Sequence, residues 1–215
     1  MSDRLHKLFN AMSRFNWNMI DKIGFDNGIY IVFENGESYH GVYRVTRVGT
    51  HNSDGRLRAR LKNHFISKNK DGSIFRKNVG KAILNMNDNP YLRVWTMNSS
   101  KKCDMVSVEG YNSEYQKSVE ADVSKYMCEY VSFVCFPVQT MSERLRLEEG
   151  IISELYNTSD FTSSQTWLGK HSTENEITRS GMWLKRGLGG VPLTLGEYQQ
   201  IELYCATVEN GESYI

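Results

Sequence analysis

Alternating apolar and polar positions predict a β-hairpin early in the chain. The run from Ile29 to Phe33 is rich in β-branched and aromatic side chains, which is typical of a half-buried strand. It is followed by Glu34–Glu37, which contains Asn-Gly, the strongest short signal for a hairpin turn. A second strand is predicted from about Tyr43 to Val48. We therefore expect the two strands to pair as neighbours in one sheet.

Apolar residues at helical spacing predict helices around this hairpin. Residues 5–20 should form one amphipathic helix that packs on the sheet. Residues 57–64 should form a basic helix that Leu57 and Leu61 hold against the sheet. Further helices are predicted over 73–84 with Ser73 as the N-cap, over 115–127, over 143–155 with Ser142 as the N-cap, and from Glu197 to about Leu203.

A third strand is predicted at the β-rich run Val131–Val138, which should lie at the centre of the sheet. The polar stretch Asn85–Asn112 predicts a surface excursion with short strands near Leu92–Val94 and Met105–Val108. The expected fold class is therefore α/β (α+β). It consists of a small antiparallel or mixed three-stranded sheet flanked by helices.

The composition indicates one globular domain over residues 1–215, in which the tail from 157 packs on the rest. Hydrophobic residues make up 40% of the chain, which is ordinary for a globular protein. The chain has only three prolines and no low-complexity tract, so the sequence shows no linker between two domains. The four cysteines lack CxxC spacing, which argues against zinc and favours buried free thiols in a cytoplasmic protein. No apolar run is long enough to suggest a signal peptide or a membrane span.

Charge is distributed unevenly along the chain, although the net charge is only +1. From Arg56 to Lys81 there are nine Lys and Arg residues and one acid, Asp71. Such a basic segment on an otherwise acidic body suits a phosphate-binding face. A lysine-rich solvated helix face explains the same pattern equally well.

Glu148 is the anomalous residue of the predicted helix over 143–155. It falls one turn from Leu145 and from Ile152, so a carboxylate lies on the expected apolar stripe. Such a group needs a partner or a metal ion. A carboxylate for Mg²⁺ and an arginine for phosphate, such as Arg60, are what hydrolysis of a phosphodiester requires.

Four short matches, in order along the chain, resemble the GIY-YIG nucleases. Gly28-Ile29-Tyr30 matches the first signature, and Arg47-Val48-Gly49 occupies the place of the second. Arg60 and His64, four residues apart, match the helix motif, and Glu148 before an Ile-Ile pair matches the metal-binding glutamate. The resemblance covers about residues 24–156, which would be the catalytic module.

The resemblance implies a DNA endonuclease that uses a single Mg²⁺ or Mn²⁺ ion held by Glu148. Tyr30 and His51 would handle the attacking water, Arg60 would clamp the phosphate, and His64 would complete the catalytic set. The implied partner is DNA, and the oligomeric state, monomer or homodimer, stays open. The expected DNA contacts are Arg47, Arg56, Arg58, Lys62, Lys68, Lys70, Arg76 and Lys77.

The chain departs from the family pattern at two positions. Arg47 stands where the second signature has tyrosine, and His51 or Tyr43 could replace that group. The family's final asparagine has no clear counterpart, since Asn157 comes early and Asp160 stands near the position. A catalytically impaired DNA-binding or regulatory protein on a nuclease fold is the alternative function.

The C-terminal tail holds two tryptophans among glycines, Trp167 and Trp183. Packing over the domain is the favoured role of both residues, and base stacking is the other role considered. This tail also motivates a third hypothesis, that the chain is a structural or protein-interaction domain.

Overall fold

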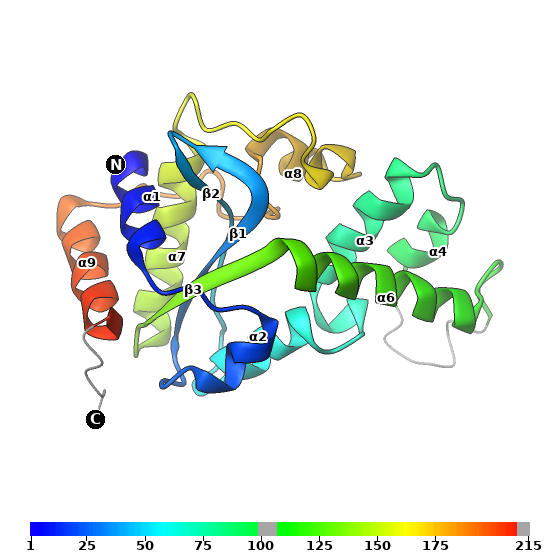
Figure 1. The fold of residues 1–215 in the computed structure, drawn as a ribbon, viewed down its shortest axis with the longest axis horizontal. Coiled ribbons are helices and arrows are strands. Elements are labelled where there is room, and N and C mark those ends of the chain that lie inside the picture. The colour runs from blue at the N-terminus through cyan, green and yellow to red at the C-terminus, as the bar shows by residue number, and fades with distance from the viewer. Residues whose placement is uncertain (99–106, 210–215) are drawn as a thin grey trace.

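A three-stranded sheet forms the centre of the molecule (Figure 1). The computed structural model describes residues 1–98 and 107–209. The strand order is β2-β1-β3, and β1 pairs antiparallel with both neighbours, so the expected α/β fold is confirmed. The strands are β1 Gly28–Tyr39, β2 Val42–Gly49 and β3 Val131–Pro137; the α-helices are α1 Ser2–Ala11, α2 Leu57–Phe65, α3 Ile74–Met86, α4 Leu92–Thr96, α6 Ser113–Tyr130, α7 Met141–Tyr156, α8 Asn175–Ser180 and α9 Leu195–Glu209; the 3₁₀ helices are η1 Trp17–Lys22, η2 Lys70–Gly72 and η3 Leu168–His171.

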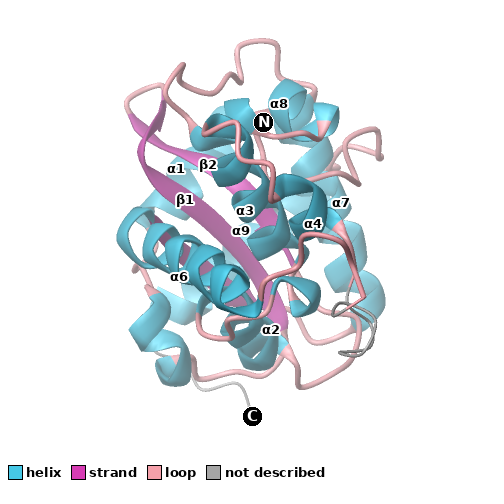
Figure 2. Cartoon of the chain, turned by 90° about the vertical axis from the view of Figure 1, so that its right-hand side faces the viewer, coloured by secondary structure: helices cyan, strands magenta, loops and turns pink. Residues whose placement is uncertain are grey.

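Helices cover both faces of this sheet. Ile29 and Ile31 point to one face and pack with residues of α1, α7 and α9. Tyr30 and Val32 point to the other face and pack with residues of α2, α3 and α6. Figure 1 shows α1, α7 and α9 together on one side of the strands and α3, α4 and α6 on the other, and Figure 2 shows α6 beside β1. The alternation along β1 therefore separates two cores.

The hairpin turn lies at His40-Gly41, and the prediction of a turn at Asn35-Gly36 is wrong. His40 and Gly41 both have positive φ angles, 47° and 83°, as a tight two-residue hairpin turn requires. The stretch around Asn35-Gly36 instead stays within β1 as an irregularity in its pairing. The physical reason is that Glu34 and Glu37, on either side of the Asn-Gly pair, are buried.

β1 is the central strand and β3 is an edge strand, so the prediction of a central strand at 131–138 is wrong. The outer edge of β3 is partly covered by Phe15. Phe15 N donates to Phe133 O at 2.7 Å, and Phe133 N donates to Phe15 O at 2.9 Å. This bridge also explains why the helix predicted over 5–20 ends at Ala11 and why η1 follows as a separate element.

Most predicted helices are present, with differences at their ends. Ser73 caps α3 as predicted, because its Oγ accepts the amide of Arg76 at 3.2 Å. α7 begins after Thr140 rather than Ser142, since Thr140 Oγ1 accepts the amide of Glu143 at 3.4 Å. α6 is longer than predicted at both ends, and α9 is longer than its predicted range.

The polar excursion from residue 85 to 112 contains a helix where a strand was expected. Residues 92–94 lie in α4, so the strand prediction is wrong there. The indole of Trp95 is buried, and its Nε1 donates to Lys77 O at 2.9 Å, which ties α4 to α3. Of the second predicted strand, 105 and 106 lie outside the described residues, and 107 and 108 lie in a turn region.

The C-terminal tail packs over the hairpin through buried charged residues. Trp167 Nε1 donates to Glu34 Oε2 at 2.8 Å, and Trp183 Nε1 donates to Glu34 Oε1. Arg44 pairs with Glu37 at 2.5 Å, and both side chains are almost completely buried. We call Glu34, Glu37 and Arg44 the tail cluster. The predicted packing role of both tryptophans is confirmed, and their burial rules out stacking on a base from solvent.

Candidate active site

The two glycines of the signature segments are required by close approaches of neighbouring atoms. Tyr30 on β1 is paired with Gly49 on β2. A Cβ at Gly49 would lie 2.2 Å from Tyr30 Oη, so only glycine leaves room for this phenol. A Cβ at Gly28 would lie 2.3 Å from the carbonyl oxygen of Phe136 on β3. Arg47-Val48-Gly49 therefore keeps the glycine on which the position of Tyr30 depends.

A chain of hydrogen bonds holds Tyr30 in place. Ser73 Oγ accepts the Arg76 amide at 3.2 Å and lies 2.6 Å from His64 Nδ1. In the Nε2–H tautomer of His64, Ser73 Oγ donates to Nδ1, and Nε2 donates to Tyr30 Oη at 2.8 Å. Burial, with nearby arginines, lowers the pKa of His64 well below 6.5, so the ring is neutral. His64 therefore positions Tyr30 and leaves the phenol proton of Tyr30 for another acceptor.

His51 is bound on both ring nitrogens, which does not fit the predicted role in handling water. Its Nε2 accepts the amide of Gly28 at 3.3 Å, and its Nδ1 lies 2.6 Å from Ser53 O, to which it donates. Burial lowers the pKa of His51. Accepting a proton at Nε2 would break the bond to Gly28. His51 instead ties the start of β1 to the loop that follows β2.

Glu148 lies on the side of α7 shared with Leu145 and Ile152, as predicted. Leu145 is 39% exposed and Ile152 is 3% exposed, so this side of the helix is buried only toward its C-terminal end. Burial raises the pKa of the Glu148 carboxyl, while Arg47, the amide of Thr50 and Arg60 act in the opposite direction. No salt bridge to Glu148 exists among residues 1–98 and 107–209. The carboxylate is thus near cations without being neutralised by one.

Two neighbouring hollows meet at this point. The first, which we call the cleft, has a volume of about 620 Å³ and lies between α3, α7 and tail residues 183–187. The second, which we call the arginine pocket, has about 290 Å³ and contains Arg56, Arg60 and His51. Asn52 lines both hollows. Glu148 lines the cleft, and the charge of Arg60 in the arginine pocket acts to lower the pKa of its carboxyl. Glu148 therefore lies where the two hollows adjoin.

Arg60 and Arg56 differ from most other cations of the basic segment, because no acid pairs with them in the described parts of the chain. Arg60 is half-buried on α2, and Arg56 is exposed just before it. Two guanidinium groups in a small polar pocket suit a phosphate. Arg60 was expected to reach a cleft, and in the structure it lines the arginine pocket.

Arg47 occupies the cleft rather than the outer surface. It is 5% exposed, its guanidinium donates to Trp183 O, and it lies 5.1 Å over the ring of Phe75. Its Nε has no hydrogen-bond partner among the described residues. Asn78 on α3, 1% exposed, also lines the cleft, and its Oδ1 is likewise without a partner. Each such buried atom costs about 1–3 kcal/mol when it stays unsatisfied.

Three of the predicted DNA contacts are buried and already paired. Arg76 binds Glu120 at 2.7 Å and is fully buried. Lys70 Nζ donates to Asp71 at 2.8 Å, and Lys77 Nζ donates to Met97 O at 3.2 Å. The reason is that η2 and α3 turn these side chains inward, against α6 and the end of α4. They hold elements together and present no surface to a phosphate.

The remaining predicted DNA contacts lie nearer the surface. Arg58 is bound to the carbonyl oxygen of Ile23 at 2.8 Å and also to Asp26, so it anchors the segment before β1. Lys62 forms a partly exposed pair with Asp21 at 2.6 Å. Lys68 is exposed. Lys62 and Lys68 are therefore the members of this group that could reach a backbone phosphate.

Sequence reasoning missed the polar residues that the tail and α3 bring to the cleft. Lys185 and Arg186 are exposed at its rim, and Lys185 pairs with Glu174 at 2.5 Å. Asn78 lies inside it. Lys185 and Arg186 follow Trp183, a predicted packing residue, after one intervening leucine, so these nearby cations were the available signal. Nothing in the local sequence distinguishes Asn78.

The residues fit a single hard cation better than a multi-ligand metal site. No group of three or more His, Cys, Asp or Glu side chains that could hold a metal ion is found in the described ranges. Mg²⁺ keeps several waters and often takes only one or two carboxylates. Glu148 offers such a carboxylate in a partly open cleft, and Glu149 lines the same cleft. This donor set is compatible with one hydrated magnesium or manganese ion.

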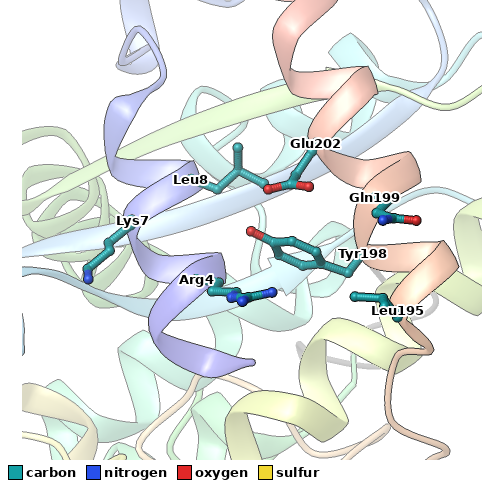
Figure 3. Close-up of a pocket in the computed structure, with 7 residues that line it drawn as sticks. All are labelled: Arg4, Lys7, Leu8, Leu195, Tyr198, Gln199 and Glu202. Carbon is teal, nitrogen blue, oxygen red and sulfur yellow. The ribbon is translucent and has the colours of Figure 1, made fainter.

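A separate hollow lies between α1 and α9, away from these residues. Figure 3 shows Arg4 and Lys7 from α1 and Tyr198 and Glu202 from α9 around it. Burial and the hydrogen bond to Glu202 raise the pKa of Tyr198 to about 12, so this phenol stays protonated. Tyr198 and Glu202 bind each other here, whereas two residues of the cleft have buried atoms without partners in the described part of the chain.

A comparison with protein-family models decides the family. The model of the GIY-YIG domain matches residues 3–189. The chain belongs to the GIY-YIG family. A search of curated proteins gave no match. A search of solved structures gave no match.

Membership of the GIY-YIG family makes the chain a member of a nuclease family whose enzymes act on DNA and generally depend on a divalent metal. The match begins in α1 and continues through the tail to residue 189, so it extends well beyond the expected module of 24–156. The segment with Trp183, Lys185 and Arg186 is therefore part of the matched domain. No helix in the described residues is both long and apolar enough to cross a membrane.

Proposed function

We propose that this GIY-YIG protein is a metal-dependent DNA endonuclease with its active site where the cleft meets the arginine pocket. One observation carries the proposal. Tyr30, Arg60 and Glu148 come from β1, α2 and α7, and all three converge on the Gly49-Thr50 segment. Arg60 lines the arginine pocket and Glu148 lines the cleft, while Tyr30 is fully buried with its Oη against Gly49.

Each residue has a distinct role in the proposed reaction. Arg60, with Arg56 beside it, binds the phosphate and stabilises the charge that builds on its oxygens. Tyr30 Oη, held by His64, orients the water whose oxygen forms the new bond to phosphorus as the bond to the leaving sugar oxygen breaks. Glu148 would hold a divalent cation, which when bound supplies positive charge and lowers the pKa of a bound water.

The role proposed for Tyr30 no longer includes His51. The bonds of His51 to Gly28 and Ser53 favour a structural function. Neither His51 nor Tyr43 is needed to replace the missing tyrosine of the second signature, because Arg47 brings a guanidinium to the cleft in its place. This substitution places a positive charge near Glu148.

The test is incubation of the purified protein with supercoiled plasmid and Mg²⁺ or Mn²⁺. Nicking or linearisation by the wild-type protein, and its loss in Glu148→Ala, is the expected result. Undiminished cleavage by both Glu148→Ala and Arg60→Ala would show that the nuclease site lies elsewhere.

The alternative is a DNA-binding or regulatory protein that has lost catalysis. The buried guanidinium of Arg47 near Glu148 favours it, because a fixed cation competes with a metal ion for the carboxylate. Retention of DNA in a gel, without nicking in any of several divalent metals, would support this alternative against the endonuclease.

A further inference from the structure

The cleft has more apolar surface than a phosphate or a metal ion requires. Ile74 on α3 and Leu145 on α7 are 45% and 39% exposed, and both line it. Ile152 and Trp183 also border it but are buried, at 3% and 0% exposed. Its volume of about 620 Å³ falls within the range of about 300–1,000 Å³ that is typical of sites for small organic ligands.

Two residues that line the cleft, Arg47 and Asn78, each have one buried polar atom without a hydrogen-bond partner among the described residues, and the two atoms need opposite kinds of partner. Arg47 Nε carries a proton to donate, and Asn78 Oδ1 can only accept one. Neither has a partner within the described ranges, although Arg47 is 5% and Asn78 1% exposed. A phosphodiester offers acceptors alone, so it could satisfy Arg47 and not Asn78. A nucleobase edge offers an acceptor and a donor side by side.

We propose that the cleft binds a base of the substrate strand next to the cleaved phosphodiester, and that Asn78 and Arg47 read its edge. This inference rests on the proposed nuclease function. The arginine pocket then takes the phosphate, Glu148 lies between the two, and the base lies between Ile74 and Leu145. Because the cleft is lined by two helices and the tail, the base must leave its stack to enter, as in other enzymes that extrude a nucleotide.

The experiment measures binding and needs no cleavage. The full-length protein is titrated with each of the four deoxynucleoside 5′-monophosphates and with deoxyribose 5-phosphate, and binding is followed by ligand-observed NMR. Base-containing nucleotides should bind about tenfold more tightly than the baseless sugar phosphate. Equal binding of the two kinds, or no binding by any of the four nucleotides, would overturn the inference.

Variants test whether Asn78 reads the base. Asn78→Ala should weaken nucleotide binding about fivefold or more and reduce the differences among the four bases. Asn85→Ala is the matched control, since Asn85 lies on the same helix but is exposed and bound to His171 O. If Asn78→Ala fails to fold, Leu145→Ala serves, because an exposed leucine is removed without a buried cavity. Full retention of nucleotide affinity in both variants would contradict the proposal.

Competition separates a substrate base from a free nucleotide ligand. A single-stranded DNA oligonucleotide should displace the bound monophosphate from the wild-type protein. If the nucleotide binds in a base-dependent way and DNA does not displace it, the cleft belongs to a free nucleotide, and the inference fails. Plasmid nicking without base-dependent binding would leave the nuclease function intact and refute only the cleft assignment. Base-dependent binding displaced by DNA, without nicking, would support the cleft and refute the nuclease function.

Discussion

The tail cluster and the cleft both take charged residues from the β1–β2 hairpin, but they differ in what completes them. In the tail cluster, Glu34 accepts hydrogen bonds from Tyr126, Trp167 and Trp183, and Glu37 binds Arg44. Arg44 also donates to Gly181 O at 2.5 Å. Protein atoms therefore satisfy this cluster, which closes the tail over the sheet.

In the cleft and the arginine pocket, several polar groups lack a hydrogen-bond or ion-pair partner among the residues that the structure describes. Arg47 and Asn78 each have an unpartnered buried atom, and no acid pairs with Arg60 in the part of the chain that the structure describes. Burial raises the pKa of Glu148 without a salt bridge to offset it. Buried charge alone thus does not identify a site. Between these two regions, what differs is whether protein atoms satisfy the buried polar groups, although Arg144 Nε and Ser163 Oγ, outside both hollows, also lack partners within the described ranges.

Breaking the tail cluster should have the largest effect on stability. Arg44→Ala leaves Glu37 buried without its cation, which should lower the free energy of unfolding by about 3–5 kcal/mol. Arg56→Ala, at an exposed position, should change it by less than about 0.5 kcal/mol. Denaturant unfolding of the purified variants measures both values. Equal stabilities would mean that this ion pair does not hold the tail.

Breaking the cleft should affect activity instead. Glu148→Ala should slow cleavage by about 10²–10³-fold or more, while the stability stays the same or rises, because a partly buried carboxylate without a salt bridge to any described residue is removed. Mg²⁺ should raise the unfolding temperature of the wild type and not of this variant. Glu154→Ala on the same helix is the control for both measurements. A metal-induced stabilisation that survives in Glu148→Ala would contradict the metal assignment.

Two buried histidines extend the comparison to pH. His6 packs beside β2, and burial lowers its pKa to about 4. Below pH 6.5, His6 is protonated in the unfolded chain but stays neutral in the folded protein until the pH approaches 4. The free energy of unfolding therefore falls as the pH falls. His6 should account for about 3 kcal/mol of that loss between pH 6.5 and about 4. His64, whose pKa is also lowered, acts in the same direction.

Variants of the two histidines should have similar effects on stability but different effects on activity. His6→Gln and His64→Gln should each flatten the fall in stability, measured by denaturant unfolding at several pH values. Only His64→Gln should also slow cleavage at neutral pH, since Tyr30 loses its hydrogen-bond donor. If His6→Gln slows cleavage as much as His64→Gln does, the effect comes from the fold rather than from Tyr30.

Local patterns were sufficient for the elements that depend on neighbouring residues. The alternation in β1, the helical spacing of α2 and the capping of α3 by Ser73 are all properties of short stretches, and they were predicted correctly. The turn failed because Asn35-Gly36 gives a strong local signal that the burial of Glu34 and Glu37 overrides. Glu34 is bound by two tryptophans more than a hundred residues away, and Glu37 is bound by Arg44 and by Ser164 of the tail.

The candidate site divides in the same way. Tyr30, Arg60 and Glu148 could be found from the sequence, because short motifs carry them. The inward direction of Lys70, Arg76 and Lys77 could not, since it depends on contacts with α6 and the end of α4. Charge counted along the chain therefore overestimated the basic surface. Asn78 has no motif and is identified only by an oxygen that lacks a partner.

Two lysines of the basic segment test whether burial distinguishes structural cations from cations that bind DNA. Lys68 is exposed, while Lys70, two residues later, is 2% exposed and donates to Asp71 and Met97 O. Lys68→Ala should reduce the salt dependence of DNA binding by about one unit of slope, with a stability change below about 0.5 kcal/mol. Lys70→Ala should leave the salt dependence unchanged and cost about 1–3 kcal/mol of stability, because buried acceptors lose their donor. Binding titrations at several salt concentrations, with denaturant unfolding, measure both. A salt slope that falls equally in both variants would mean that Lys70 reaches DNA, and burial in this segment would then not separate structural from binding cations.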